Sequence, residues 1–226
     1  MRDFIIPGAI AVAGILIAGG VYIHLRMQAG QEPSTVSPTA DLSLIPPVTS
    51  ADHILGNPAA PVVIIEYSDF DCPFCKQFHD TLHQLMASYG TNGDVAWVMR
   101  EFPLTELHPN AAKHAEAAEC VARVGGSDAF WKFGDLLFGG QPTNPSAYPA
   151  LLAKVGVDSS QFDACMSQGD TATLVAGERQ DALSAGAQGT PFSVLLVKGH
   201  TPVAIPGALP LDQLKTLVDN AIQSTK

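Results

Sequence analysis

Apolar positions between residues 51 and 226 follow two patterns, short continuous runs and longer stretches with helical spacing. A continuous run of valine and isoleucine at 62–65 is typical of a strand that is buried on both faces of a sheet. Residues 74–89 instead place an apolar side chain every three or four positions, which predicts an amphipathic helix. Further strands are predicted at 95–102, 193–197 and 203–205, and further helices between 108 and 186 and at 211–222.

The order of these elements predicts an α/β fold. A strand–helix–strand unit over 62–102 is followed by a helical block at about 108–186 and then by a strand–strand–helix unit. A βαβ unit followed by a ββα unit is the arrangement of the thioredoxin fold. We therefore predict one thioredoxin domain at 51–226 with an inserted helical block.

The beginning of the chain has a different character. Residues 4–23 carry no charge over about 20 positions, which as a helix spans the roughly 30 Å of a bilayer's hydrocarbon core. This stretch is long for a cleaved signal peptide and no obvious cleavage site follows it, so we predict an uncleaved transmembrane signal anchor at 1–26. A cleaved signal peptide is the alternative. Residues 27–50 are rich in proline, serine and threonine, which predicts a flexible linker.

Composition and charge exclude some classes of protein. With 46% hydrophobic residues the chain is too apolar to be disordered. A formal net charge of −10 argues against a nucleic-acid-binding protein, because such a protein needs a basic surface toward phosphates. Four cysteines are too few for a disulfide-stapled scaffold, but they are enough for one redox site and one structural bridge.

Two of the cysteines form a C-x-x-C motif, Cys72-Pro73-Phe74-Cys75, where a predicted strand leads into a predicted helix. A thiol at a helix N-terminus lies at the positive end of the helix dipole, which stabilises the thiolate and lowers the thiol pKa from about 8.5. The thiolate is the attacking species in thiol–disulfide exchange. We therefore predict that Cys72 is an exposed nucleophile and that Cys75 resolves the mixed disulfide. Pro73 suits the first helical turn, where its missing N–H loses no hydrogen bond.

A structural zinc site is the alternative interpretation of the motif. Closed zinc sites use four ligands, commonly from two paired motifs, and the chain has no second C-x-x-C. His79 and His83 follow Cys75 by four and eight residues, so a cluster of cysteine and histidine on one helix face is geometrically possible. Histidines at such positions are more often ordinary solvated residues, and we expect no metal.

Three segments together carry a family resemblance: LGNP at 55–58, EYSDFDCPFC at 66–75 and Gly189-Thr190-Pro191. They resemble the DsbA-type thiol:disulfide oxidoreductases of the thioredoxin superfamily, in particular their membrane-tethered bacterial members. The resemblance extends over most of residues 51–226. It implies thiol–disulfide exchange through the redox-active Cys72–Cys75 disulfide, with no other cofactor.

The resemblance also implies roles for three residues outside the motif. Glu66 matches the family's buried acid, which exchanges a proton with Cys75 through water. A solvent-facing glutamate at a strand end is the alternative. Pro191 matches the family's cis-proline beside the disulfide, which would expose the Thr190 backbone to pair with an extended substrate strand. An ordinary trans proline is the alternative there.

The residue before the second cysteine departs from the family's strongest oxidants, which have a histidine in that place. Phe74 supplies no cation, and Asp69 and Asp71 add negative charge nearby. Both effects oppose the thiolate. We therefore expect Cys72 to be less acidic, and its disulfide less oxidising, than in those members.

The remaining cysteines, Cys120 and Cys165, both lie on apolar faces of predicted helices. A disulfide between them is implied by the resemblance, because some tethered relatives have one. Two buried free thiols are the alternative. A structural disulfide would indicate an oxidising compartment outside the cytoplasm.

Three functions fit these features. A thiol oxidase would pass the Cys72–Cys75 disulfide to reduced or unfolded secreted proteins. A disulfide isomerase or reductase would keep the same site reduced; Thr190 also occurs in isomerase-type relatives, but the 27–50 segment is too short and proline-rich for the dimerisation domain that isomerases of this superfamily generally carry. A non-catalytic metal-handling module would use Cys72, Cys75 and His79. We favour the oxidase.

For an oxidase the resemblance implies a membrane quinone-linked partner of the DsbB or VKOR type that reoxidises the site. Tethering to the membrane would raise the effective concentration of the domain near that partner. We expect a monomer in the bacterial cell membrane with a single span, its catalytic domain on the extracytoplasmic side, and no nucleic-acid partner.

Overall fold

The computed structural model describes residues 40–226. The predicted signal anchor and most of the predicted linker lie outside these residues, so both stay predictions. Within the described part of the chain, no helix has the length and apolar character needed to cross a bilayer.

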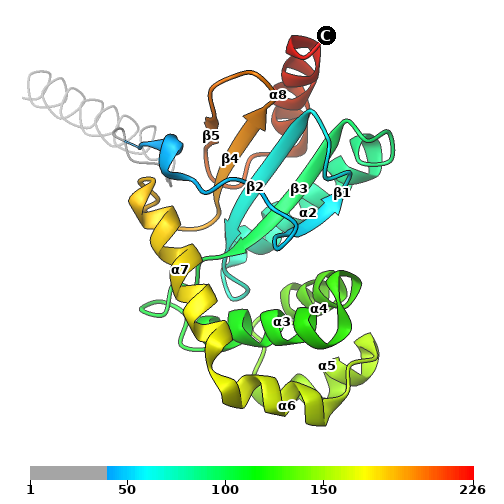
Figure 1. The fold of residues 1–226 in the computed structure, drawn as a ribbon, viewed down its shortest axis with the longest axis vertical. Coiled ribbons are helices and arrows are strands. Elements are labelled where there is room, and N and C mark those ends of the chain that lie inside the picture. Colours follow the sequence, from blue (N-terminus) through cyan, green and yellow to red (C-terminus); the bar gives the residue numbers. More distant parts are fainter. Residues whose placement is uncertain (1–39) are drawn as a thin grey trace, which may run out of the picture. The chain divides into compact units, whose positions relative to one another are not determined.

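A mixed five-stranded sheet forms the centre of the domain, in the order β1-β3-β2-β4-β5 (Figure 1). Strands β2 and β3 are parallel, and every other neighbouring pair is antiparallel. The strand bounds are β1 His53–Gly56, β2 Val62–Ser68, β3 Val95–Glu101, β4 Phe192–Val197 and β5 Val203–Ile205. This is the predicted thioredoxin arrangement, and the prediction of that fold is confirmed.

Within residues 40–226, nine helices and short 3-10 helices surround the sheet. Helix α2 follows β2 and α8 ends the chain, while the others follow β3 or precede the sheet (Figure 1). The bounds are η1 Leu42–Leu44, α2 Pro73–Tyr89, α3 Ala111–Gly125, α4 Ser127–Gly139, η2 Pro145–Ala147, α5 Tyr148–Val155, α6 Ser159–Gln168, α7 Asp170–Ser184 and α8 Leu211–Ser224.

Alternation along the strands gives the sheet two apolar faces. Ile64 points into a large core that includes side chains of α2 and α8, such as Leu82 and Leu214. Its neighbour Ile65 points into a smaller core on the opposite face, where the end of α7 contributes Ala182. Both isoleucines are fully buried, which explains why the strand is a continuous apolar run.

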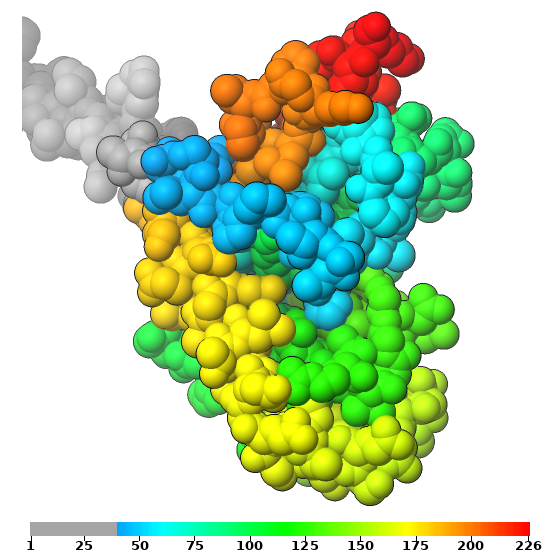
Figure 2. Space-filling model, in the orientation of Figure 1, coloured from blue at the N-terminus to red at the C-terminus, as the bar shows by residue number. Residues whose placement is uncertain are grey.

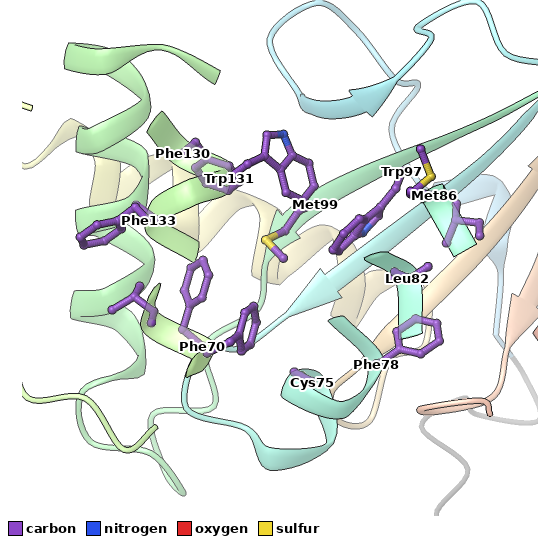
Figure 3. Packing of buried hydrophobic residues seen from close by; sticks show 14 of the residues in the cluster. Phe70, Cys75, Phe78, Leu82, Met86, Trp97, Met99, Phe130, Trp131 and Phe133 are labelled. Carbon is purple, nitrogen blue, oxygen red and sulfur yellow. The ribbon is translucent and has the colours of Figure 1, made fainter. Parts of the chain in front are cut away.

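The inserted helices share the large core of the sheet. Figure 3 shows Trp97 of β3 between side chains of α2, including Leu82, and the aromatic residues of α4. The ring centroids of Trp97 and Trp131 lie 4.6 Å apart. The helical block predicted at about 108–186 is therefore packed on the thioredoxin unit through one continuous core.

Residues 40–50 belong to the folded domain, so the linker predicted for 27–50 is wrong for its last part. Ile45 and Val48 pack against the smaller core, and the carbonyl oxygens of Pro46 and Pro47 accept hydrogen bonds from the Arg100 guanidinium. Figure 2 shows this segment, in blue, lying against α7 in yellow. The prolines that suggested a free tether instead hold an extended segment whose carbonyls face an arginine.

Two strand predictions also need correction. Strand β1 was not expected, because its four residues include His53 and Gly56 and form no apolar run; it exists because it pairs with the edge of β3. Strand β2 continues to Ser68 rather than ending at residue 65, because its polar end still pairs with β3 and is buried.

Candidate active site

The C-x-x-C motif lies where β2 turns into α2, as the sequence predicts. Cys72 is the N-cap of α2 and Pro73 is in its first turn. The backbone N–H of Cys72 donates to the carbonyl of Asp69 at 3.0 Å, which closes the turn between strand and helix. The free N–H groups at the start of α2 therefore surround the first sulfur of the motif.

The sulfur of Cys72 is held as a stabilised thiolate. The thiol of Cys75 hydrogen-bonds to it, and this contact contributes most to lowering the pKa of Cys72 to about 6. Burial opposes that effect, while Thr190 and backbone N–H groups at the start of α2 add to it. The negative charges of Asp69 and Asp71, which the sequence suggested would oppose the thiolate, do not prevent this shift.

Cys72 is less exposed than predicted, with only 4% of its surface accessible. The reason is the neighbouring loop, because the carbonyl oxygen of Thr190 lies 3.6 Å from the Cys72 sulfur. Cys75 is fully buried, and burial raises its pKa well above the ordinary value of a thiol. The two sulfurs therefore differ in the way that a nucleophile and a resolving thiol require.

Glu66 lies at the centre of the sheet with no solvent exposure, so the alternative of a solvent-facing glutamate is wrong. Ser68 Oγ and Trp97 Nε1 donate to its two carboxylate oxygens at 2.9 and 3.1 Å. Burial nevertheless raises the pKa of Glu66 to about 8. A carboxyl group that is mostly protonated at neutral pH can give a proton to a departing thiolate.

The Thr190–Pro191 peptide bond is cis, as expected from the resemblance. Strand β4 begins at the next residue and pairs with β2. This pairing brings the Thr190–Pro191 loop next to the C-x-x-C motif, although the two are far apart in the sequence. Thr190 contacts Cys72 through its carbonyl oxygen, and its own hydroxyl is buried without a hydrogen-bond partner.

Two residues that the sequence analysis missed hold the backbone of the active-site loop. The Gln141 side-chain amide donates to the carbonyls of Phe70 and Cys72 at 2.7 and 3.1 Å. Gln141 follows α4 and is far from the motif in sequence, so no local signal marks it. Its contacts tie the inserted helices to the motif.

Asp69 is the second missed residue. One of its carboxylate oxygens accepts from the backbone N–H of Leu104, and the ring of His108 lies 2.9 Å from the same oxygen. The other oxygen accepts from the backbone N–H of Asp71. Asp69 thus fixes the shape of the loop before Cys72, although its charge alone suggested only an electrostatic effect.

Cys120 of α3 and Cys165 of α6 are joined by a disulfide, which links two helices of the inserted block. Their Cα atoms lie 5.7 Å apart. The alternative of two free thiols is therefore wrong, whereas Cys72 and Cys75 are present as free thiols.

A metal site made of Cys72, Cys75 and His79 is not assembled among residues 40–226. The ring of His79 instead faces Asp135 of α4, with Nε2 at 2.8 Å from Oδ1. Within the described residues, the one group of three metal-binding side chains that converges is His79, His83 and Asp135, and it contains neither cysteine.

The comparisons with known proteins agree with this geometry. Residues 48–220 match the protein family described as Thioredoxin. Curated relatives include the Na(+)/H(+) antiporter NhaA 3 of Salinispora tropica, 33% identical over 164 residues, and the Na(+)/H(+) antiporter NhaA 1 of Salinispora arenicola, 29% identical over 184 residues. These matches cover 72% and 81% of this chain but only 24% and 26% of the antiporters, so the chain spans about a quarter of their length.

Solved structures resemble the described domain over most of its length. Wolbachia pipientis alpha-DsbA1 has a TM-score of 0.71 and 19% identity, covering 80% of this chain and 96% of that one. BdbD from Bacillus subtilis has a TM-score of 0.67 and 21% identity, covering 84% and 99%. A thioredoxin-like oxidoreductase from Silicibacter pomeroyi has a TM-score of 0.64 and 26% identity, covering 77% and 94%. The described domain shares its fold with these proteins, and the chain belongs to the thioredoxin family.

Proposed function

We propose that the chain is an extracytoplasmic thiol:disulfide oxidoreductase that introduces disulfides into reduced or unfolded secreted proteins. The observation that carries the proposal is the unequal pair of thiols: the pKa of Cys72 is lowered to about 6, while that of Cys75 is raised. A stable Cys72 thiolate favours the reduced form of the enzyme, and this makes its disulfide an oxidant toward ordinary thiols.

The exchange begins with the site oxidised. A substrate thiolate attacks the sulfur of Cys72, the Cys72–Cys75 bond breaks, and a mixed disulfide forms between substrate and Cys72. Cys75 leaves as a thiolate and takes a proton, which Glu66 supplies through water. A second substrate thiolate attacks the substrate sulfur of the mixed disulfide and releases Cys72 as a thiolate. The substrate is oxidised by two electrons and the enzyme is reduced by two.

Substrate chains bind beside the motif as extended segments. The Thr190 backbone offers pairing positions for such a segment. Two exposed apolar side chains lie on segments joined to the motif: Phe74, between the two cysteines, is 55% exposed, and Leu107, on the loop held by Asp69, is 71% exposed. Apolar contact of this kind favours unfolded chains over folded ones.

The proposal also includes where the domain acts and how its active site is reoxidised. The Cys120–Cys165 disulfide supports a position in an oxidising compartment. The predicted anchor would hold the domain at the extracytoplasmic face of the membrane, near a quinone-linked oxidase of the DsbB or VKOR type that returns the two electrons to the membrane. We propose no transport activity from the antiporter relatives, because the chain covers a minor part of them.

Trapping experiments test this function. Cys75→Ser should accumulate mixed disulfides when its Cys72 thiolate attacks a disulfide of a substrate protein and displaces one substrate thiol, because no resolving thiol is left to release the substrate. Cys72→Ser should accumulate none. Both should fail to oxidise a reduced test protein. Full oxidase activity in Cys75→Ser would contradict the assignment of roles, and efficient rearrangement of scrambled disulfides without net oxidation would favour an isomerase.

A further inference from the structure

A second chemical site lies on the face of α2 that is shared with α4. His79 and His83 are one helical turn apart on α2, and Asp135 of α4 faces them. These side chains line an open pocket of about 500 Å³. None of them takes part in the exchange chemistry described above.

The three ligating atoms form a tight triangle. Asp135 Oδ1 lies 2.8 Å from His79 Nε2 and 3.0 Å from His83 Nε2, and the two Nε2 atoms lie 3.1 Å apart. Zinc with bonds of about 2.0–2.2 Å holds tetrahedral ligand atoms about 3.3–3.6 Å apart, so shifts of a few tenths of an ångström would admit an ion. Histidines at positions i and i+4 of a helix are a known arrangement for such binding.

Hydrogen bonding alone satisfies this triangle poorly. If both Nε2 atoms carry protons, each donates to the same carboxylate oxygen and the two N–H groups face one another at 3.1 Å. If one of them lacks a proton, Asp135 Oδ1 loses a donor. A cation resolves the conflict, because all three lone pairs can then point to one centre.

We propose that His79, His83 and Asp135 form a binding site for a divalent transition metal of the zinc class, with its open coordination positions toward the pocket. Two of the three donors are imidazole nitrogens, which suit zinc, nickel or copper and disfavour calcium and magnesium. The inference is independent of the thiol chemistry, and it departs from the expectation that the chain binds no metal.

The site would be of moderate strength. Nδ1 of His79 is buried without a hydrogen-bond partner, so no outer acceptor orients this ring. Its orientation is fixed instead by packing against Trp97 and Phe138. Lys76 also lines the pocket and opposes a cation there, and Asp80 on the same wall offsets it. We therefore expect micromolar affinity. A bound ion would join the active-site helix to the inserted block.

The test is a titration of the full chain with zinc alone, in competition with a chromophoric chelator. The Cys72–Cys75 pair is kept oxidised so that its thiolates do not bind the ion. We expect one equivalent to bind and to raise the melting temperature. His83→Ala and Asp135→Asn should each weaken binding at least tenfold, and both positions are partly exposed, 38% and 47%, so the fold should tolerate them.

His200→Ala is the matched control, because His200 is an exposed histidine far along the chain, and it should bind zinc like the parent. The double variant Cys72→Ser/Cys75→Ser should also keep the site, which separates this inference from the exchange function. The absence of saturable binding by the oxidised parent would overturn the proposal. So would equal affinity in the parent, His83→Ala and Asp135→Asn, or loss of binding in the double cysteine variant.

Discussion

Cys72 and Cys75 carry the same side chain but ionise differently, because α2 gives them different surroundings. Cys72 caps the helix beside the backbone N–H groups of its first turn, whereas Cys75 lies one turn further along and is fully buried. The sequence predicts this difference from the position of the motif alone, since a strand leading into a helix defines the helix start. It does not predict the contact with Thr190, which depends on how β4 meets β2.

Alkylation of reduced protein measures the ionisation of Cys72 directly. The pKa of Cys72 is lowered from 9.0 to about 6, so its alkylation rate should follow a single titration with a midpoint near pH 6. Ionisation stabilises the reduced fold above the unfolded pKa, and this stability is lost as the pH falls through about 6. In Cys75→Ala the midpoint should rise, because the main hydrogen-bond donor is gone. A midpoint near 9 in the parent would refute the account.

For Glu66, the predicted dependence of stability on pH has the opposite sign. Its pKa is raised from 4.5 to about 8, so the buried carboxyl destabilises the fold increasingly as the pH rises through that interval. Glu66→Gln should therefore gain most stability at pH 8 or above and little at pH 4, as measured by urea unfolding of the reduced protein. It should also slow the release of Cys75 from the Cys72–Cys75 disulfide, when a substrate thiolate attacks Cys72, by roughly 10²-fold. An unchanged rate in stopped-flow experiments would show that the acid plays no part.

Elements with a clear apolar pattern were predicted from sequence, whereas a strand without one was not. The strand over Val203–Ile205 was predicted with the observed bounds, and the helix predicted at 211–222 is α8, Leu211–Ser224. Strand β1 has no such pattern and depends on pairing with β3. The structural roles of Gln141 and Asp69 were missed for a related reason, because their hydrogen-bond partners are backbone groups or lie in other elements of the fold.

The disulfide between α3 and α6 should contribute stability without affecting the redox site. It joins residues 45 positions apart, and closing such a loop is worth about 4 kcal/mol in the chain-entropy model. The variant Cys120→Ala/Cys165→Ala should lose stability up to that amount in urea unfolding. Its Cys72–Cys75 potential should equal that of the parent, and a large change in potential would contradict the separation of the two pairs.

The folded domain includes residues 40–50, although their proline-rich composition predicts that they belong to the linker. Proline-rich composition predicts extension, and the segment is extended after the short helix η1 (Leu42–Leu44), but composition does not show which surface such a segment packs against. The Arg100 guanidinium fixes the segment through Asp52 and two proline carbonyls. The domain therefore begins before residue 51.

One isoleucine and one leucine of this segment allow a matched test of whether the segment packs on the domain. Ile45 packs on the smaller core, whereas Leu44 is 51% exposed. Ile45→Asp should destabilise the full chain by about 1–3 kcal/mol, because a charge would replace an apolar contact. Leu44→Asp should change stability by less than about 0.5 kcal/mol. Equal effects in urea unfolding would mean that the segment does not pack on the domain.

The central claim is that a thiolate held at the start of α2 makes the Cys72–Cys75 disulfide an oxidant. Equilibration of the full chain with defined mixtures of reduced and oxidised glutathione measures its reduction potential. We predict a value above about −230 mV, and below the roughly −120 mV of the strongest oxidants because Phe74 supplies no cation. A potential at or below about −270 mV, the value typical of thioredoxin, would identify a reductant and contradict the account.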